Sequence, residues 1–565
     1  MGPADGRSRA ASKESPDQEP LLFNHPLALE LTYIAVEEAI RLGASYADAR
    51  FEFRHREDVT THNGRLDIAR SQITRGLGVR VLLQGAWGYV GVSEPSRHDV
   101  TVAARRATEL ARAAAILQST PVELVPQTPH RGEVYRTQIK RDPLAVPFEN
   151  KVDLLLAIDE KLTSVDQIVS ARSQFCAQRQ RKLFVNSEGS EIEQELVFTS
   201  VGYQAGASNG DDYQVRSYPA GMGLVMGKGW ELVGESPLLE TAVETAEEAV
   251  ALLSAPEISA ADSGALILTA PMLAHHLQST CAPLTELDLS LSADGFMPTD
   301  QLGAYVFGSD RVNLYADARE ASGAGGFGFD DEGVEAQRVD LVVDGRFVGY
   351  LTSRETAQQV GLESSSGAMR AAGWEACPQV RCTNLCLAPG QDGDLDALIE
   401  STERGVLIDG PKAVLLDASG RRFVGQGEVG WRIENGKKVE RLKNPVYRGA
   451  HPEFWRGCDA VCGPDSFRLF GSLTTKAPGD RPIPVGHGAA PARFTNVALG
   501  SRSVSGADSD SAVLPRVDNA TKIPTTDGGA ASAAVPLEGV VRSIRRPPPA
   551  MVRSKKRRVR RKDVR

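Results

Sequence analysis

Residues 46–93 read YADARFEFRHREDVTTHNGRLDIARSQITRGLGVRVLLQGAWGYVGVS. Two turn signals interrupt this stretch: the dipeptide Asn63-Gly64, a strong marker of a tight hairpin, and Gly85. The stretch is therefore predicted to form successive strands joined by short turns. It decides the fold class, because the segments that flank it follow a helical pattern instead.

The rest of the chain divides into helical and strand-like segments. Helical periodicity predicts helices at residues 26–42, 98–115, 150–163 and 237–253. From Gln174 the pattern returns to strands, and the alternation in EIEQELVFTSVGYQA, residues 191–205, fits half-buried antiparallel strands. Residues 254–264 are a predicted domain junction, and the segment after it is predicted to be β-rich with a short helix near residues 266–290.

These elements predict an α+β fold. It comprises, in order, a disordered N-terminus (1–20), an N-terminal α/β domain (21–260), a β-rich C-terminal domain (261–500), a flexible linker (501–540) and a basic disordered tail (541–565).

Composition excludes several classes of protein. The 565 residues are 41% hydrophobic and 24% charged, which is ordinary for a globular protein. No apolar run approaches the ~18 residues of a membrane span, so no membrane association is expected. The first 20 residues have no apolar core, which argues against a secretory signal. Seven scattered cysteines indicate a reducing compartment, and the predicted location is the cytoplasm.

Charge is distributed unevenly along the chain. Residues 542–565 hold 12 Lys or Arg and one acidic residue, Asp563. The net charge of −9 therefore combines a tail of +11 with a body of −20. The tail, residues 541–565, is a candidate for non-specific binding to nucleic acid, which should weaken steeply with salt.

Several blocks, in order, resemble the TldD/PmbA family of zinc metallopeptidases, also called modulators of DNA gyrase. The resemblance covers about residues 27–500. Its blocks are RGLGVRVLLQGAWGYVGVS (75–93), FVNSEGSEIEQ (184–194), NLYADARE (313–320), GGFGFDDEGVEAQRVDLVVDGRFVGYLTSRETA (325–357), RCTNLCLAPG (381–390), HPEFWRGCDAV (451–461) and PVGHGAAPARFTNV (484–497).

The resemblance implies an N-terminal α/β domain followed by a β-rich domain that carries the active site. It also implies a dimer, in which a catalytic subunit can pair with a subunit that lacks the metal motif. The active type binds zinc and cleaves unfolded or short peptides held in extended form along a channel. Its ligands are the two histidines of H-E-x-x-x-H and a later cysteine in a C-G-K turn.

The segment that should carry this motif is LILTAPMLAHHLQSTCAPLTELD, residues 266–288. In one register His275 takes the first-ligand position, His276 replaces the glutamate and Thr280 replaces the second histidine. In the other register His276 is the first ligand, Leu277 replaces the glutamate and Cys281 the second ligand. Neither register supplies two histidines and a general base. Two adjacent helical histidines also point about 100° apart, so both cannot easily face one metal.

The third ligand position is changed as well. Thr474 stands where the family has its cysteine, and a hydroxyl is a poor zinc ligand beside thiolate or imidazole. We therefore expect zinc to be absent or altered, and the chain to act as the non-catalytic subunit of a homodimer or of a heterodimer with an intact TldD-type subunit. Two alternatives stay open: an active peptidase with rearranged ligands (His275 or His276, Cys281 and Glu286), and a nucleic-acid adaptor that uses the tail.

The resemblance also predicts side chains along the peptide channel: Asp330, Asp331, Glu332, Asn384 and His487. For the acidic residues, the competing interpretation is a solvated turn closed by Gly333. For His487, which lies between glycines, the competing interpretation is a structural turn. The Gly-rich segment 323–328 lacks the Lys-Ser/Thr and the helix that a phosphate-binding loop needs.

Two pairs of cysteines with C-x₃-C spacing could indicate metal sites, but the usual cysteine clusters that bind zinc or iron–sulfur groups have C-x₂-C spacing. They are Cys382 with Cys386, and Cys458 with Cys462. Ordinary buried thiols are the predicted state of all four.

Overall fold

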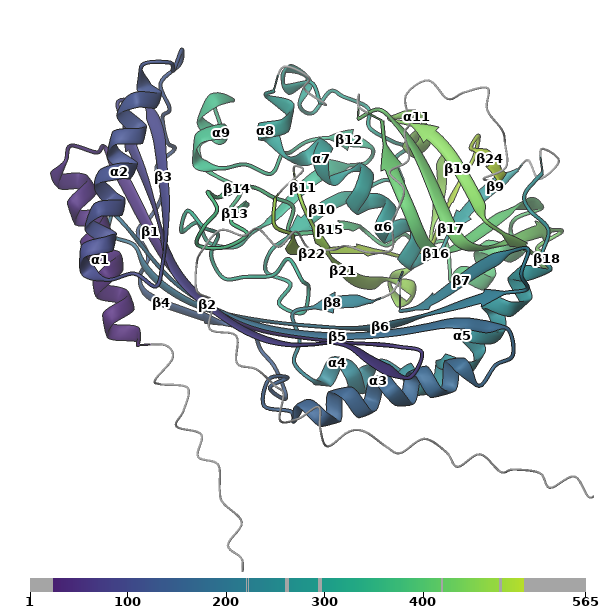
Figure 1. The fold of residues 1–565 in the computed structure, drawn as a ribbon. Helices are drawn as coiled ribbons and strands as arrows, with labels where there is room; N and C mark the ends of the chain where they lie inside the picture. The colour runs from purple at the N-terminus through teal and green to yellow at the C-terminus, as the bar shows by residue number, and fades with distance from the viewer. Residues whose placement is uncertain are drawn as a thin grey trace, which may run out of the picture.

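A long curved sheet with helices on its outer face forms the first half of the molecule (Figure 1). The computed structural model describes residues 24–501 apart from 220, 222, 260–263, 293–296, 418–419 and 477–479. The predicted disordered N-terminus, the linker beyond its first residue and the basic tail lie outside the described residues. Within them, the predicted α+β fold is confirmed.

The strand order of this sheet is β3-β2-β1-β5-β6-β4, with β7 and β8 also paired to β6. Its strands are β1 Tyr46–His62, β2 Arg65–Leu83, β3 Ala86–Ser93, β4 Arg131–Arg136, β5 Ile168–Asn186, β6 Glu191–Ser208, β7 Tyr213–Tyr218 and β8 Leu224–Met226. The helices of this half are α1 His25–Arg41, α2 Arg97–Ala115, α3 Phe148–Thr163, α4 Glu231–Glu235 and α5 Leu238–Leu253.

Local sequence accounts for the ends of these elements. Asn63 and Gly64 both have positive φ, 49° and 70°, as a tight hairpin turn between β1 and β2 requires. Gln84 and Gly85 repeat this geometry between β2 and β3. The α2 helix begins with a capping box in which the Ser96 side chain accepts a hydrogen bond from the third helical backbone N–H.

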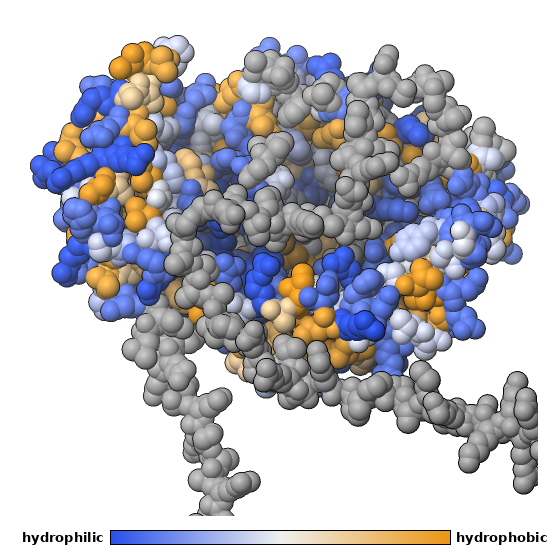
Figure 2. Space-filling model, in the orientation of Figure 1, coloured by the Kyte–Doolittle hydropathy of each residue, from blue (hydrophilic) through white to orange (hydrophobic). Residues whose placement is uncertain are grey.

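Two hydrophobic cores hold the helices to the outer face of the sheet. One joins α1 and α2 to β1 and β2, and the other joins α3 and α5 to β5 and β6. Some apolar side chains on α1 and α2 remain exposed, and orange patches lie over that end of the molecule in Figure 2. The opposite, concave face of the sheet is covered by the second half of the chain.

The second half is built on two further sheets. Their orders are β12-β11-β10-β15-β22-β21 and β20-β23-β9-β16-β17-β19-β24, the latter with β18 paired to β17; β13 and β14 pair separately. The strands are β9 Ala265–Leu268, β10 Leu314–Asp317, β11 Arg338–Val343, β12 Arg346–Phe347, β13 Met369–Arg370, β14 Gln379–Val380, β15 Asn384–Leu387, β16 Arg404–Leu416, β17 Arg422–Glu434, β18 Lys437–Lys443, β19 Pro445–Ala450, β20 Cys458–Val461, β21 Arg468–Thr474, β22 Ile483–Ala489, β23 Ala492–Phe494 and β24 Ala498–Ser501.

Short helices connect these strands. They are α6 Ala270–Thr280, α7 Ala282–Thr285, α8 Leu287–Ser290, α9 Arg354–Gln359, α10 Leu395–Glu400 and α11 Glu453–Arg456, with the 3-10 turns η2 Thr299–Gln301 and η3 Pro464–Ser466. The predicted short helix within residues 266–290 is thus confirmed as α6 to α8. Helix α6 packs between the two sheets, against β16 and β17 on one side and β15, β21 and β22 on the other.

Candidate functional site

Helix α6 carries both histidines of the motif region, and they face different surroundings. Thr269 precedes the helix, Pro271 lies in its first turn, and the helix ends at Cys281. His276 is completely buried, whereas His275 is only partly covered. The two side chains diverge, as the rotation of about 100° per residue predicts.

His276 lies inside an aromatic box formed by Phe423, Tyr447, Phe454 and Trp455. Ring centroids of Phe423 and Phe454 are 4.7 and 4.8 Å from its imidazole. Its Nδ1 shares a hydrogen bond of 3.0 Å with the Tyr447 hydroxyl. Burial, followed by the nearby His451 and His275, holds the pKa of His276 well below its ordinary value. The imidazole is therefore a neutral member of the core.

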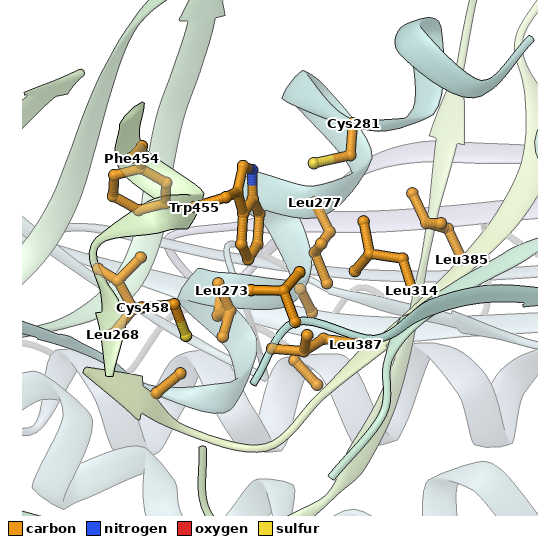
Figure 3. Packing of buried hydrophobic residues seen from close by; sticks show 14 of the residues in the cluster. Leu268, Leu273, Leu277, Cys281, Leu314, Leu385, Leu387, Phe454, Trp455 and Cys458 are labelled. Carbon is orange, nitrogen blue, oxygen red and sulfur yellow. The ribbon is translucent and has the colours of Figure 1, made fainter. Parts of the chain in front are cut away.

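Cys281 and Leu277 belong to the same hydrophobic core as the aromatic box. Figure 3 shows the Cys281 sulfur directed toward Trp455, with Leu273 and Leu277 beside it. Burial raises the pKa of the Cys281 thiol to about 12. The register that makes ligands of His276 and Cys281 would thus place the metal in an apolar interior.

His275 belongs to α6 and His487 to β22, and these two elements pack against each other. Burial, and then the electrostatic effect of His275, lower the pKa of His487 to about 3. Burial lowers that of His275 to about 4. The Nδ1 atom of His487 is buried and has no hydrogen-bond partner among the described residues. The two elements that carry these imidazoles therefore face each other in the fold, which the linear sequence did not suggest.

Both threonines at ligand positions already have hydrogen-bond partners. The Thr280 hydroxyl donates to the His276 carbonyl oxygen at 2.8 Å, a bond within its own helix. The Thr474 hydroxyl accepts a hydrogen bond from Arg381 at 3.0 Å. Neither group presents a thiolate or imidazole to a metal.

Glu286 is engaged elsewhere, in a buried ion pair. Its carboxylate lies 2.7 Å from the Lys476 ammonium and accepts a hydrogen bond from the Cys382 backbone N–H at 2.8 Å. Lys476 also pairs with Asp288 at 2.7 Å. The lysine therefore joins the end of the motif region to the turn that follows Thr474. Burial raises the pKa of Glu286, although Lys476 opposes this effect.

The described side chains can be compared with the ligands that a catalytic zinc ion requires. A catalytic zinc needs three protein ligands, one open position and a base. Within the described ranges, no group of three or more His, Cys, Asp and Glu side chains has an arrangement suited to a metal ion. Among the described residues, the His276, His451 and His487 rings each keep a buried nitrogen without a hydrogen-bond partner, but they do not form such a group of three with one another or with a Cys, Asp or Glu side chain.

The acidic turn at residues 330–332 is buried, so the interpretation of a solvated turn is wrong. Asp330 accepts hydrogen bonds from three backbone N–H groups, those of Glu332, Val334 and Met369, at 2.9–3.0 Å. Burial, and then Glu332, raise the pKa of Asp330 to about 8. The turn is therefore part of the interior of the molecule.

The other two carboxylates of this turn contact the curved sheet. Asp331 lies 3.0 Å from Lys182 and 3.3 Å from Arg50, and these cations keep its pKa low despite burial. Glu332 lies 3.1 Å from Arg80. The acidic turn therefore links the two halves of the molecule through buried ion pairs.

Asn384 organises the Gly-rich loop at residues 323–328. Its side-chain oxygen accepts a hydrogen bond from the Gly325 backbone N–H at 2.9 Å, and its amide group donates to the Asp317 carbonyl at 2.7 Å. A Cβ on Gly323 would stand 2.2 Å from that same side-chain oxygen, which explains a glycine there. The loop thus encloses a buried amide rather than a phosphate.

Two smaller predictions can be compared with the structure. His487 lies in the middle of strand β22, so the interpretation of a structural turn is wrong. The four cysteines of the C-x₃-C pairs are free and buried, as predicted.

Two residues of buried ion pairs, Lys476 and Arg80, were not predicted from the sequence, because their partners lie far away along the chain. For Arg80 the available signal was a charge within an apolar strand, whereas the residues around Lys476 offered no comparable signal.

Known proteins resemble this chain over most of its length. Models of the PmbA/TldA metallopeptidase match in three parts: domain 1 at residues 47–115, the central domain at 141–253 and the C-terminal domain at 263–500. A metalloprotease from Methanothermobacter thermautotrophicus is 30% identical over 461 residues, which span 80% of this chain and 95% of that protein.

No helix in the described part of the chain is long and apolar enough to cross a membrane.

Solved structures share the fold. A candidate modulator of a DNA gyrase from Thermotoga maritima has a TM-score of 0.66 at 17% identity, over 83% of this chain and 99% of that one. TldE from Thermococcus kodakarensis has a TM-score of 0.61 at 16% identity, over 82% and 99% of the two chains. With the three matching domain models and the archaeal metalloprotease, these likenesses establish that the chain belongs to the PmbA/TldD metallopeptidase family.

Proposed function

We propose that this chain is a non-catalytic subunit of a TldD/PmbA-type peptidase dimer. In this role it would shape the channel for an unfolded peptide, while an intact subunit supplies the zinc and the general base. The proposal concerns three positions at which the family has a glutamate, a second histidine and a cysteine. In one register His276, Thr280 and Thr474 stand at those positions, and in the other Leu277 and Cys281 take the places of the glutamate and the second histidine.

The observation that carries the proposal is the aromatic box around His276. A residue that replaces the general base must reach a metal-bound water. The His276 imidazole instead shares a hydrogen bond with the Tyr447 hydroxyl and lies among four aromatic rings. The hydroxyls of Thr280 and Thr474 make hydrogen bonds of their own. The scaffold around these positions remains well formed, which suits a subunit that binds without cleaving.

Metal content and peptidase activity of the purified chain test this proposal. Elemental mass spectrometry at neutral pH, on protein without a metal-binding tag, should find far less than one zinc per chain. Cleavage of an unstructured peptide should require an added TldD-type subunit with an intact H-E-x-x-x-H motif. About one zinc per chain, with chelator-sensitive cleavage by the chain alone, would overturn the proposal.

One observation favours a second candidate, an active metallopeptidase with rearranged ligands. The His487 Nδ1 atom is buried without a hydrogen-bond partner among the described residues, and strand β22, which carries it, packs against α6, which carries His275. This candidate predicts zinc-dependent cleavage that disappears in both His275→Ala and His487→Ala. Substituting Cys281, which lies in the core, should then leave zinc binding in place. Full zinc binding by both histidine variants would rule this candidate out.

A further inference from the structure

A small cavity lies between the concave face of the curved sheet and the β21–β22 hairpin. Its volume is about 50 Å³, which suits a group as small as a carboxylate. Strands β1 and β5 supply polar side chains to its wall, and the hairpin supplies Leu473 and Ile483. Four cations line it, namely Arg54, Arg56, Lys182 and Arg370, and two carboxyl groups, those of Asp330 and Asp331, also belong to its wall.

Three of these cations already have a carboxylate partner. Arg54 lies 2.6 Å from Glu52, and Lys182 lies 3.0 Å from Asp331. Arg56 pairs with Asp58 at 2.7 Å and donates to both of its carboxylate oxygens. Each of these three cations therefore has a carboxylate partner within the protein, although Lys182 shares Asp331 with Arg50.

Arg370 differs from the other three. Across the described ranges, no carboxylate lies within ion-pair distance of its guanidinium, which instead donates to the carbonyl oxygens of Cys382 at 3.0 Å and Pro484 at 2.7 Å. Burial, and then the neighbouring Arg381, lower the pKa of Arg370 to about 10. The Arg370 side chain is partly buried, and Asp331, which lies beyond ion-pair distance, opposes these effects. A guanidinium withdrawn from water without a paired carboxylate is unfavourable, and a second arginine nearby increases that cost.

We propose that this cavity is a carboxylate-binding site centred on Arg370, and that its ligand is a carboxylate of an extended peptide. A guanidinium holds a carboxylate through paired N–H groups, and two of the five N–H groups of Arg370 are engaged by the carbonyls. The Phe327 ring, 5.6 Å from the guanidinium, forms an apolar wall beside it.

The position of the cavity connects it to the peptide channel. Leu473, in its wall, precedes Thr474, which stands at the family's cysteine-ligand position. A peptide that passes the metal region would thus reach Arg370 with a nearby side chain or with its C-terminus. This inference rests on the proposed function, and it adds a preference for acidic peptides.

Four alanine-based peptides, each with an uncharged BODIPY label on its N-terminus, test the inference on the full chain. They combine a central Glu or Gln with a free or amidated C-terminus, and binding is followed by fluorescence anisotropy. At least one peptide with a carboxylate should bind about 10-fold more tightly than the neutral peptide. The Glu and Gln pairs distinguish a side-chain carboxylate from a C-terminal one.

Variants assign the preference to Arg370. Arg370→Gln should abolish it, and Arg370→Lys should retain part of it because the charge remains. Arg319→Gln, which removes an exposed arginine paired with Asp317, should keep the full preference. Circular dichroism and thermal melting of each variant separate a loss of binding from a loss of folding.

A second probe keeps the inference independent of peptide binding. Glutarate, at constant ionic strength, should raise the melting temperature of the wild type and of Arg319→Gln, but not that of Arg370→Gln. If neutral and acidic peptides bind equally and glutarate does not change the melting temperature, the proposed carboxylate site is refuted, but the proposed peptide channel is supported. If glutarate stabilises the protein but no peptide binds, the channel fails and the carboxylate site stands.

Discussion

Tyr447 and His276 share a 3.0 Å hydrogen bond that fixes an imidazole of α6 within the C-terminal core. The bond joins β19 to helix α6. The next residue of the helix, His275, is only partly covered. His276 thus contributes to the packing of α6 within the core, whichever motif position it occupies.

The first prediction concerns the two adjacent histidines. His276→Ala should lower the free energy of unfolding by about 2–5 kcal/mol, because it leaves a cavity and a buried Tyr447 hydroxyl without its partner. His275→Ala, the matched control, should cost clearly less, because His275 is only partly covered. Urea denaturation followed by tryptophan fluorescence measures both values. Equal losses in the two variants would contradict the structural role of His276.

The second prediction concerns acid. The folded-state pKa of His487 is about 3, below the ordinary value of ~6.5, so the unfolded chain takes up more protons below pH 6.5. Stability that is present at pH 7 should therefore be lost as the pH falls through 6.5. His487→Gln should reduce the loss between pH 7 and 5 by about 1–2 kcal/mol.

Urea denaturation of His487→Gln and wild type at both pH values checks this difference. The exposed His98→Gln variant controls for the removal of one titratable group. An unchanged loss of stability in His487→Gln would show that the imidazole is already accessible to protons in the folded state.

Local patterns predicted the elements of the fold well. The hairpin at Asn63-Gly64, the helix that ends before Gly43 and the alternation of residues 191–205 all depend on neighbours along the chain, and each appears as expected. The family blocks predicted the overall fold for a similar reason, because they preserve the turns and apolar positions that specify it.

The candidate site was harder to predict, because its contacts join distant residues. Tyr447 meets His276 from 171 positions away, and Glu332 meets Arg80 from 252 positions away. Periodicity shows which face of an element is apolar, but not which side chain of another element packs on it. Periodicity and spacing along the chain therefore do not decide between the two motif registers.

The third prediction concerns the ion pair of Lys476 with Glu286. Lys476→Met should lower the free energy of unfolding by about 3–5 kcal/mol, because it leaves the buried carboxylate without its cation. The double variant Glu286→Gln/Lys476→Met should lose less than the two single variants together. Urea denaturation of all four proteins gives the coupling energy. Strict additivity would mean that the two charges do not stabilise each other.

The fourth prediction concerns the contact between the two halves. Arg80 lies 2.6 Å from Asp48 and 3.1 Å from Glu332, and all three side chains are buried. Arg80→Met should cost about 3–5 kcal/mol, because two buried carboxylates then lack a counter-ion.

Glu332→Gln provides the matched comparison for this fourth prediction. Its amide oxygen can still accept the hydrogen bond that Arg354 donates from its backbone N–H at 2.8 Å, so the loss of stability should be smaller. Urea denaturation measures the loss of stability, and limited proteolysis measures the effect on the contact between the two halves of the molecule. Arg80→Met should expose the connection between the halves to cleavage earlier than Glu332→Gln does. Equal resistance of Arg80→Met and wild type would show that apolar packing, and not this buried ion-pair network, holds the C-terminal half against the curved sheet.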